Sequence, residues 1–292
     1  MTDMEQSVEE PIVEKPKRKL INNLNDLTAT EWLPETVSVF VQRGLGSNHA
    51  DTKIEKQHPA PFSYQDVSRL IRFFTKKDQR VLDPFVGVGS TLKACAIEGR
   101  AGTGIELVPK FAQLSRERLL AEVEDASGQE VLEDNALEAI KQFEDDSFDF
   151  VVTSPPYWSI LNKKLDHKSR ERAINNLDTN YSNLEEDLAN IADYDQFIRV
   201  LGDFFIDCSR ILKPRKYMAI IVSDFRNKEK YYMFHSDLAN HLEKGPYQLK
   251  GIKILYQRHK KIFPYGYPYS YVPNLHHQYI IILQNDKDTN AK

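Results

Sequence analysis

The sequence predicts an α/β fold built on a mostly parallel, doubly wound β-sheet. From Val81 onward, short apolar runs alternate with amphipathic stretches of helix length, the pattern of strands joined by crossover helices. A glycine-rich turn also follows the first of these strands directly, at the start of the next helical stretch. With 292 residues, the chain is long enough for one large domain with a full hydrophobic core. No apolar run approaches the roughly 18 residues that a membrane span requires.

Six strands and five helices are expected, and no internal repeat interrupts them. The strands are expected at Arg80 to Asp83, Ala101 to Glu106, Glu130 to Glu133, Phe148 to Thr153, Tyr217 to Ser223 and Gln278 to Leu283. The helices are expected at Tyr64 to Thr75, Ser90 to Glu98, Pro109 to Glu124, Tyr194 to Leu212 and Phe234 to Lys244. Residues 159–192 are polar and lack a strong period, which predicts a long loop with short helices over one edge of the sheet.

The charge of the chain is slightly acidic overall and uneven along the sequence. A formal net charge of −4 argues mildly against nucleic-acid binding, because lysine and arginine make most phosphate contacts. Basic runs nevertheless occur at 15–19, 163–172, 210–216 and 258–261, and each is equally compatible with a solvated surface. Residues 1–20 are charged and lack the apolar core of a secretion signal, so we expect a disordered tail and a cytoplasmic protein.

The two cysteines, Cys95 and Cys208, lie far apart in the sequence. They support neither a disulfide framework nor a cysteine metal site, and the eight histidines have no metal-ligand spacing. We therefore expect both cysteines to pack inside helices, in a reducing compartment, and we expect no metal.

The glycine-rich turn indicates a site for a nucleotide-like cofactor. In the segment from Val81 to Thr91, the Gly-x-Gly spacing lets the backbone approach a ligand, but Leu92 occupies the third glycine position of a dinucleotide fingerprint. No Gly-Lys-Ser/Thr of a P-loop follows. Glu106 ends the next predicted strand, where a carboxylate can accept hydrogen bonds from both ribose hydroxyls. Asp134 follows the third strand, where a carboxylate can bind an adenine amino group. These residues predict an adenosine-containing cofactor and leave a nicotinamide and a methyl donor both open.

The sequence Thr153-Ser154-Pro155-Pro156-Tyr157-Trp158 ends a buried strand with two prolines and two aromatic residues. Prolines fix the backbone and remove amide donors, so the carbonyl groups of Ser154 and Pro155 can be held as acceptors for an amino group. Tyr157 offers a stacking face for a planar ring. Two acceptors that hold the hydrogens of an exocyclic base nitrogen would direct its lone pair at a methyl donor, without a metal or a covalent intermediate.

At these residues the chain resembles the N4-cytosine and N6-adenine DNA methyltransferase family. The segment from Asp83 to Thr91 resembles the cofactor motif of this family, and residues 153–158 resemble its catalytic tetrapeptide with flanks. Residues 58–62 resemble the segment before the cofactor motif, and residues 276–280 resemble the closing strand, although a glutamate is commoner where Gln278 stands. The resemblance covers roughly Asn22 to Leu283. It implies a Rossmann-like fold of S-adenosylmethionine-dependent methyltransferases, with a seven-stranded, mostly parallel sheet and helices on both faces.

The resemblance implies S-adenosyl-L-methionine as the cofactor and a methyltransferase domain over residues 21–286. The catalytic residues carried over are Ser154, Pro155, Pro156 and Tyr157. The cofactor-binding residues carried over are Phe62, Asp83, Phe85, Gly87, Gly89, Ser90, Thr91, Glu106, Leu107, Asp134, Asn135 and Ser154. The cofactor motif precedes the catalytic motif, whereas many Ser-Pro-Pro-Tyr relatives have the reverse order. The position of target recognition therefore stays open, and residues 159–192 and 234–273 are candidate DNA-contacting insertions.

The implied substrate is double-stranded DNA from which the target base is flipped. Basic residues near both candidate insertions are expected to hold phosphates: Lys163, Lys164, Lys168, Arg170, Arg172, Arg258, Lys260 and Lys261. The four tyrosines of residues 265–271 suit nucleic acid or a packed proline-rich turn equally well. A serine at the first position of the tetrapeptide favours cytosine N4 over adenine N6. Cytosine C5 methylation is disfavoured, because neither cysteine lies in a catalytic setting.

Three alternatives remain on the sequence alone. Proline-proline-tyrosine tetrapeptides also serve RNA and protein-amide methylation in related folds, and the acidic composition favours these substrates slightly. The chain can also be a non-catalytic subunit of a modification or defence complex. A restriction endonuclease is a further expected partner, and a membrane is not.

Overall fold

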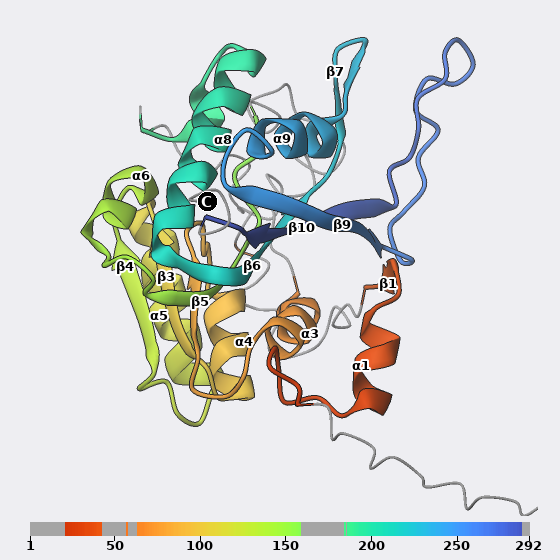
Figure 1. The fold of residues 1–292 in the computed structure, drawn as a ribbon. Coiled ribbons are helices and arrows are strands. Elements are labelled where there is room, and N and C mark those ends of the chain that lie inside the picture. Colours follow the sequence, from red (N-terminus) through yellow and green to blue (C-terminus); the bar gives the residue numbers. More distant parts are fainter. Residues whose placement is uncertain (1–20, 43–56, 58–62, 159–183, 185, 288–292) are drawn as a thin grey trace, which may run out of the picture.

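A single β-sheet forms the centre of the part of the chain that the computed structural model describes, namely residues 21–42, 57, 63–158, 184 and 186–287 (Figure 1). Eight strands follow in the order β1-β9-β10-β6-β5-β2-β3-β4. All neighbouring strands pair in parallel except β10, which runs antiparallel to both β9 and β6. The predicted α/β class with a mostly parallel sheet is confirmed.

Six of these strands match the predicted runs, with small differences at their ends. Their bounds are β2 Arg80–Asp83, β3 Ala101–Glu106, β4 Gln129–Glu133, β5 Phe148–Thr153, β6 Leu212–Val222 and β10 His277–Asn285. The sheet has eight strands rather than seven, because the short β1 (Val39–Val41) pairs with the edge of β9 (Tyr247–Tyr256). A separate two-stranded hairpin consists of β7 (Phe225–Asn227) and β8 (Lys230–Tyr232).

Residues 234–273, expected as a candidate DNA-contacting insertion, contain one helix and one strand of the main sheet in their first half. Residues 234–242 form the helix α9, which packs on α8, and residues 247–256 form β9, which pairs with β10 inside the sheet. Strand β9 was not predicted, because only two of its ten side chains are buried and its sequence therefore lacks a clear apolar pattern. The second half, residues 257–276, does connect β9 to β10 as a long loop.

Helices cover both faces of the sheet, as predicted (Figure 1). Their bounds are α1 Ala29–Glu35, α3 Tyr64–Phe74, α4 Ser90–Glu98, α5 Pro109–Glu122, α6 Ala136–Ala139, α8 Tyr194–Ile211 and α9 Phe234–Leu242, with 3-10 turns at Ile140–Gln142 and Leu188–Asn190. Asp193 caps the start of α8 by accepting a hydrogen bond from the Gln196 backbone at 2.7 Å. None of the described helices is long and apolar enough to cross a membrane.

The strands bury alternate side chains on the two faces, which places a hydrophobic core on each side. On β6, Ala219 and Ile221 pack toward α3 and α4, while Met218, Ile220 and Val222 pack toward α8 and α9. Strand β10 repeats the pattern, since Ile280 and Ile282 face the first core and Ile281 and Leu283 the second. Because both faces of the sheet are buried here, all of these side chains are apolar, and the strands appear in the sequence as continuous apolar runs.

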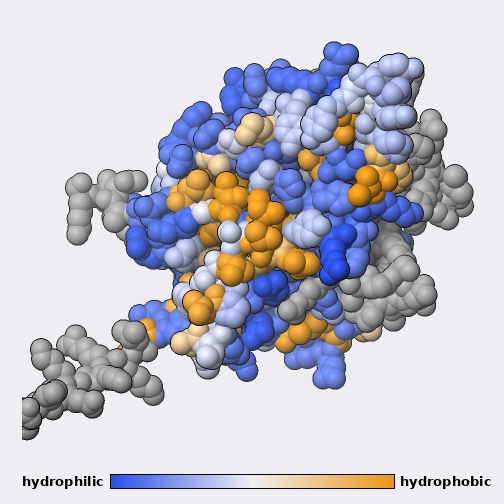
Figure 2. All heavy atoms as spheres, turned by 90° about the vertical axis from the view of Figure 1, so that its right-hand side faces the viewer, coloured by the Kyte–Doolittle hydropathy of each residue, from blue (hydrophilic) through white to orange (hydrophobic). Residues whose placement is uncertain are grey.

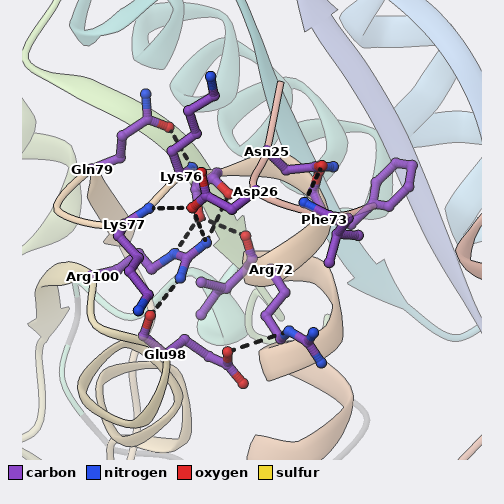
Figure 3. A network of polar contacts seen from close by, with 12 residues as sticks. Asn25, Asp26, Arg72, Phe73, Lys76, Lys77, Gln79, Glu98 and Arg100 are labelled. Atoms are coloured by element: carbon purple, nitrogen blue, oxygen red, sulfur yellow. Dashed lines mark hydrogen bonds and ion pairs between the residues drawn. The ribbon is translucent and has the colours of Figure 1, made fainter. Parts of the chain in front are cut away.

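Polar contacts attach the amino-terminal segment to the domain next to α3 (Figure 3). The Asn25 side chain donates to the Phe73 carbonyl at 2.6 Å, and Asp26 accepts from the Lys77 backbone at 2.9 Å. Arg100 is buried and donates to both the hydroxyl and the carbonyl of Thr75, at 2.9 and 2.8 Å, while Asp26 lies 3.7 Å away. Burial lowers the Arg100 pKa. The network fixes the chain that leads into α1 and β1.

The edge that carries α1 and β1 presents a partly apolar surface. Figure 2 faces this side of the molecule, and it shows apolar groups gathered in the middle below a hydrophilic upper part. Among the described residues of α1 and β1, Leu33, Val39 and Val41 are exposed. This surface lies away from the carboxyl ends of β2 and β5, which position the candidate site.

Candidate active site

The candidate site lies where the strand order of the sheet reverses. From β2 the chain proceeds outward through β3 to β4, whereas β5 and β6 lie on the other side of β2. In open α/β sheets, ligands bind beyond the carboxyl ends of the strands at such a switch point. Asp83, Glu106 and Thr153 end β2, β3 and β5 at this edge. The topology therefore brings the two predicted motifs together.

The Asp83 carboxylate joins the cofactor motif to the catalytic motif. It is fully buried and accepts hydrogen bonds from the Phe85 backbone at 3.0 Å, from the Thr153 hydroxyl at 2.6 Å and from the Thr91 hydroxyl. Burial raises the Asp83 pKa to about 6, and the three donors oppose this shift. All three donors belong to the protein itself. Asp83 therefore holds the glycine turn and the end of β5 in place.

The glycine turn is shaped by packing as well as by backbone conformation. Gly87 and Gly89 have φ values of +54° and +80°, in the left-handed region that favours glycine. A Cβ atom at Gly89 would collide with the Ser115 hydroxyl on α5, so the close approach here is to a helix. Arg118, fully buried on α5, donates to the Ser90 hydroxyl at 2.9 Å and to the Val88 carbonyl at 3.3 Å. The turn is thus fixed by α5.

Glu106 holds the turn from the other side. Its two carboxylate oxygens accept from the backbone N–H groups of Gly87 and Val108, each at 2.9 Å. Burial raises the Glu106 pKa to about 7, and these two hydrogen bonds oppose the shift. A carboxylate at this position that gained further donors from a ligand would ionise more easily.

A pocket opens beside Glu106 and reaches the catalytic tetrapeptide. Glu106, Glu186 and Asp187 give it carboxylates. Apolar and polar groups complete its lining: Pro84, Phe85, Ile105, Leu107, Val108, Phe111, Asn135, Ala136, Leu137, Ser154, Pro156 and Leu188. The pocket therefore combines an acidic side with apolar walls, and it touches residues at the ends of β2, β3 and β5.

The predicted cofactor residues divide into two groups. Phe85, Glu106, Leu107, Asn135 and Ser154 line the pocket. The others described do not: Asp83, Gly87, Gly89, Ser90, Thr91 and Asp134. Their polar groups instead bond within the protein, as in the Asp134 side chain, which accepts from the Asn135 backbone at 2.7 Å. Phe62 lies outside the described residues.

The predicted catalytic tetrapeptide, Ser154 to Tyr157, follows β5 directly. Ser154 and Pro156 line the pocket, while Pro155 is buried. The Tyr157 hydroxyl accepts a hydrogen bond from the Gln278 side chain at 3.2 Å, and the Tyr157 ring packs edge-on against Phe234 at 6.0 Å. Burial raises the Tyr157 pKa, so the hydroxyl stays neutral. The ring is thus held between β10 and α9.

A polar cluster near Tyr157 was not predicted. Asp224, buried just after β6, lies 2.6 Å from the His235 ring nitrogen Nδ1 and accepts from the His235 backbone at 3.2 Å. The His235 ring stacks on Tyr279 with centroids 3.7 Å apart. The negative charge of Asp224 also contributes to the raised pKa of Tyr157. The position of Asp224 just after the apolar run of β6 was the signal in the sequence that could have indicated this cluster.

The cysteines lie away from this site. Cys95 in α4 and Cys208 in α8 are fully buried, as predicted, and burial raises the pKa of both thiols. Neither lines the pocket. Among the described residues, no group of three or more histidine, cysteine, aspartate or glutamate side chains is arranged to hold a metal ion.

The predicted phosphate contacts fall into two sets. Arg258, Lys260 and Lys261 are exposed on the loop after β9. The other set lies outside the described residues and consists of Lys163, Lys164, Lys168, Arg170 and Arg172. The amino-terminal tail and most of residues 159–192 also lie outside them.

Comparison with known proteins finds similarity to DNA methylases over part of the chain. Residues 2–117 match a family model described as DNA methylase, for N6 and N4 methylation. The Type II methyltransferase M.BglI from Bacillus subtilis is 34% identical over 105 residues, which are 36% of this chain and 28% of the relative. M.ScaI from Streptomyces caespitosus, also a Type II methyltransferase, is 30% identical over 120 residues, 40% of this chain and 38% of the relative. The family model covers less than half of the chain, so the similarity to DNA methylases is established for its amino-terminal part.

The match to this methylase family covers the cofactor motif and ends before Ser154. The chain spans about a third of the length of these two relatives. Among solved structures, a SAM-dependent methyltransferase from Methanosarcina mazei is 16% identical with a TM-score of 0.46, covering 74% of this chain and 96% of that chain. A precorrin-6y methyltransferase from Geobacter metallireducens is 13% identical with a TM-score of 0.46, covering 76% and 87%.

Proposed function

We propose that this protein transfers a methyl group from S-adenosyl-L-methionine to the exocyclic amino group of a flipped DNA base, with cytosine N4 as the favoured target. One observation carries the proposal: a single pocket is lined by both the predicted cofactor residue Glu106 and the predicted catalytic residues Ser154 and Pro156. A methyl donor bound there lies next to the tetrapeptide. The match of residues 2–117 to a DNA methylase family model supports DNA as the substrate.

The residues of the pocket fit this cofactor. S-adenosylmethionine carries a positive sulfonium and hydroxyl donors, and it supplies a methyl group activated by that charge. Glu106 offers its carboxylate to the ribose hydroxyls, and Glu186 and Asp187 add negative charge that favours a cationic ligand. The walls near Phe85, Leu107 and Leu137 suit the faces of an adenine ring.

The tetrapeptide would position the base. The Ser154 and Pro155 carbonyl groups accept the two amino hydrogens, while the Tyr157 ring stacks on the base and Gln278 holds the Tyr157 hydroxyl in place. The bound cofactor would supply the methyl group to the amino nitrogen and leave as S-adenosylhomocysteine, and the proton released from the nitrogen would pass to solvent. Orientation and electrostatics supply the rate, since the step needs no covalent enzyme intermediate.

Ser154 supports cytosine N4 as the target. This preference comes from the resemblance, in which serine at the first position is commoner among cytosine-N4 enzymes. Adenine N6 uses the same geometry, because it is also an exocyclic amino group beside a ring. A partner restriction endonuclease remains an expectation from the family context.

The test is methyl transfer from labelled S-adenosylmethionine to unmethylated genomic DNA, followed by nucleoside mass spectrometry. N4-methylcytosine that is lost in a Ser154→Ala, Tyr157→Ala variant supports the proposal, provided that the variant unfolds in urea like the wild type. N6-methyladenine keeps the mechanism and changes the base. Tight cofactor binding without any methylated DNA base would reject the proposal and direct the search to RNA, protein or a missing subunit.

A further inference from the structure

The loop of residues 257–276 carries a group of exposed aromatic side chains. Tyr265, Tyr267, Tyr269 and Tyr271 are 42%, 81%, 93% and 86% exposed. Tyrosine combines a large apolar ring with a polar hydroxyl, and such rings gathered on a surface mark binding sites. In Figure 1 the loop projects from the sheet beside the hairpin that contains β7.

The loop holds its shape through its own hydrogen bonds. At its base, the Asn274 side chain accepts from the Phe263 backbone at 2.9 Å and donates to the Phe263 carbonyl at 2.8 Å. Near its tip, the backbone N–H groups of Tyr269 and Ser270 donate to the Gly266 carbonyl at 2.7 and 2.8 Å. Gly266 has a φ of +76°, which a side chain would oppose. Rings on such a preorganised turn lose little conformational entropy on binding.

Basic residues occur in the same loop and in the neighbouring hairpin. The Arg226 guanidinium on β7 donates to the Tyr271 carbonyl at 3.3 Å, so the hairpin and the loop lie side by side. Glu229 contributes one opposing charge at the turn of the hairpin. The basic residues of the two segments are Arg226, Lys228, Lys230, Arg258, Lys260 and Lys261. Cations interleaved with aromatic rings suit phosphates and bases together.

The base of the loop adjoins the catalytic tetrapeptide. Gln278, the second residue of β10, donates to the Tyr157 hydroxyl at 3.2 Å, and the Ser223 hydroxyl lies 3.5 Å from the His277 carbonyl. Asn274 closes the loop four residues before Gln278. Four residues of extended chain are at most about 13 Å long, so the base of the loop lies within that distance of Gln278. The loop that carries the exposed tyrosines therefore starts from the same edge of the sheet as the tetrapeptide.

We propose that Tyr267 and Tyr269 stack on bases of the duplex DNA that flanks the flipped base, while the cations of the loop and the hairpin hold the phosphates. The inference rests on the proposed function and adds to it how the duplex is opened. Flipping a base out of a duplex costs stacking and pairing energy. A tyrosine ring replaces part of the lost stacking without a sequence preference, because every base has a planar face.

The experiment compares methylation of unmethylated genomic DNA in its native duplex form and after heat denaturation. The test variant is Tyr267→Ala, Tyr269→Ala, and the conservative variant replaces both tyrosines with phenylalanine. A Leu33→Ala, Leu120→Ala variant, which removes two exposed side chains from α1 and α5, serves as the matched control. We expect the alanine variant to lose about 10- to 100-fold in rate on duplex DNA and much less on single strands. The phenylalanine and control variants should keep the wild-type rates.

Three results would overturn the inference while leaving the proposed function in place. They are an unchanged rate of the alanine variant on duplex DNA, an equal loss on both forms of DNA, or a changed oligomeric state in gel filtration that accounts for the loss. Absence of methylation by the wild-type protein on either form would reject the proposed function itself, and the inference with it. The wild-type rate therefore separates the two failures.

Discussion

The Thr153 hydroxyl donates a hydrogen bond to the Asp83 carboxylate at 2.6 Å, across 70 residues of sequence. Thr153 ends β5, which leads into the predicted catalytic tetrapeptide, and Asp83 ends β2, which leads into the glycine turn. Both side chains are fully buried. This one contact sets the position of the tetrapeptide relative to the turn.

Replacing Thr153 with valine should remove this donor and leave the buried Asp83 with less compensation. We expect a loss of about 1–3 kcal/mol in the free energy of unfolding, measured by urea denaturation, since a buried polar group that loses a partner is costly. Thr153→Ser keeps the hydroxyl and should lose less than the valine variant. Equal stability of all three proteins would show that the contact contributes little.

The raised pKa of Glu106 predicts a pH dependence of cofactor binding. With the pKa at about 7, most of this carboxyl is protonated at pH 5.5, whereas the ionised form is the better acceptor for two hydroxyls. Affinity for S-adenosylmethionine, measured by calorimetry, should therefore rise about tenfold or more between pH 5.5 and 7.5. Glu106→Gln should bind weakly at both pH values. A flat profile in the wild-type protein would contradict this role of Glu106.

The stability of the free protein should respond to Glu106 with the opposite sign. The folded pKa lies above the ordinary value of 4.5, so between these values the folded state holds the proton more tightly than the unfolded chain. Stability is then lost as the pH rises from about 4.5 to 7. The Glu106→Gln variant lacks this contribution. Relative to the wild type, its unfolding free energy should increase on the order of 1–3 kcal/mol between pH 5 and 8.

Tyr157 should act through its ring more than through its hydroxyl. Tyr157→Phe loses the hydrogen bonds of the hydroxyl to Gln278, Ser223 and Ser154 but keeps the ring, so kcat for methyl transfer to DNA should fall less than about tenfold. Tyr157→Ala removes the stacking face and should lower kcat/KM by about 100-fold or more. Comparable losses in both variants would assign the main role to the hydroxyl.

Arg118 should be important for stability although it lies outside the pocket. It is fully buried, pairs with Glu122 at 2.9 Å and fixes the glycine turn, so Arg118→Ala should destabilise the fold by about 3–5 kcal/mol in urea denaturation. On the same helix, the more exposed Arg116 pairs with Glu133 at 3.4 Å, and Arg116→Ala should cost less than about 1 kcal/mol. A similar cost for both would show that burial does not decide the contribution.

The sequence by itself determined the α/β class, six strands of the sheet and the two motifs, because these depend on local patterns. The apolar runs of β5, β6 and β10 are buried on both faces, so their strand character appears without knowledge of their neighbours. The Asp83 turn and the Pro155-Pro156 ending are likewise local features of the backbone. Strand β9 was missed because most of its side chains are not buried, and its pairing with β10 decides its state.

Only the tertiary structure decided which residues of the two motifs face the pocket. Ser90, Thr91 and Asp83 carry polar groups suited to a ligand, yet they bond to Arg118 and to each other, because α5 and β5 pack against the turn. The cluster of Asp224 and His235 forms where β6 and α9 meet, and Gln278 reaches Tyr157 across 121 residues. Such contacts follow from the strand order, which brings together distant residues whose local sequence gives no sign of the encounter.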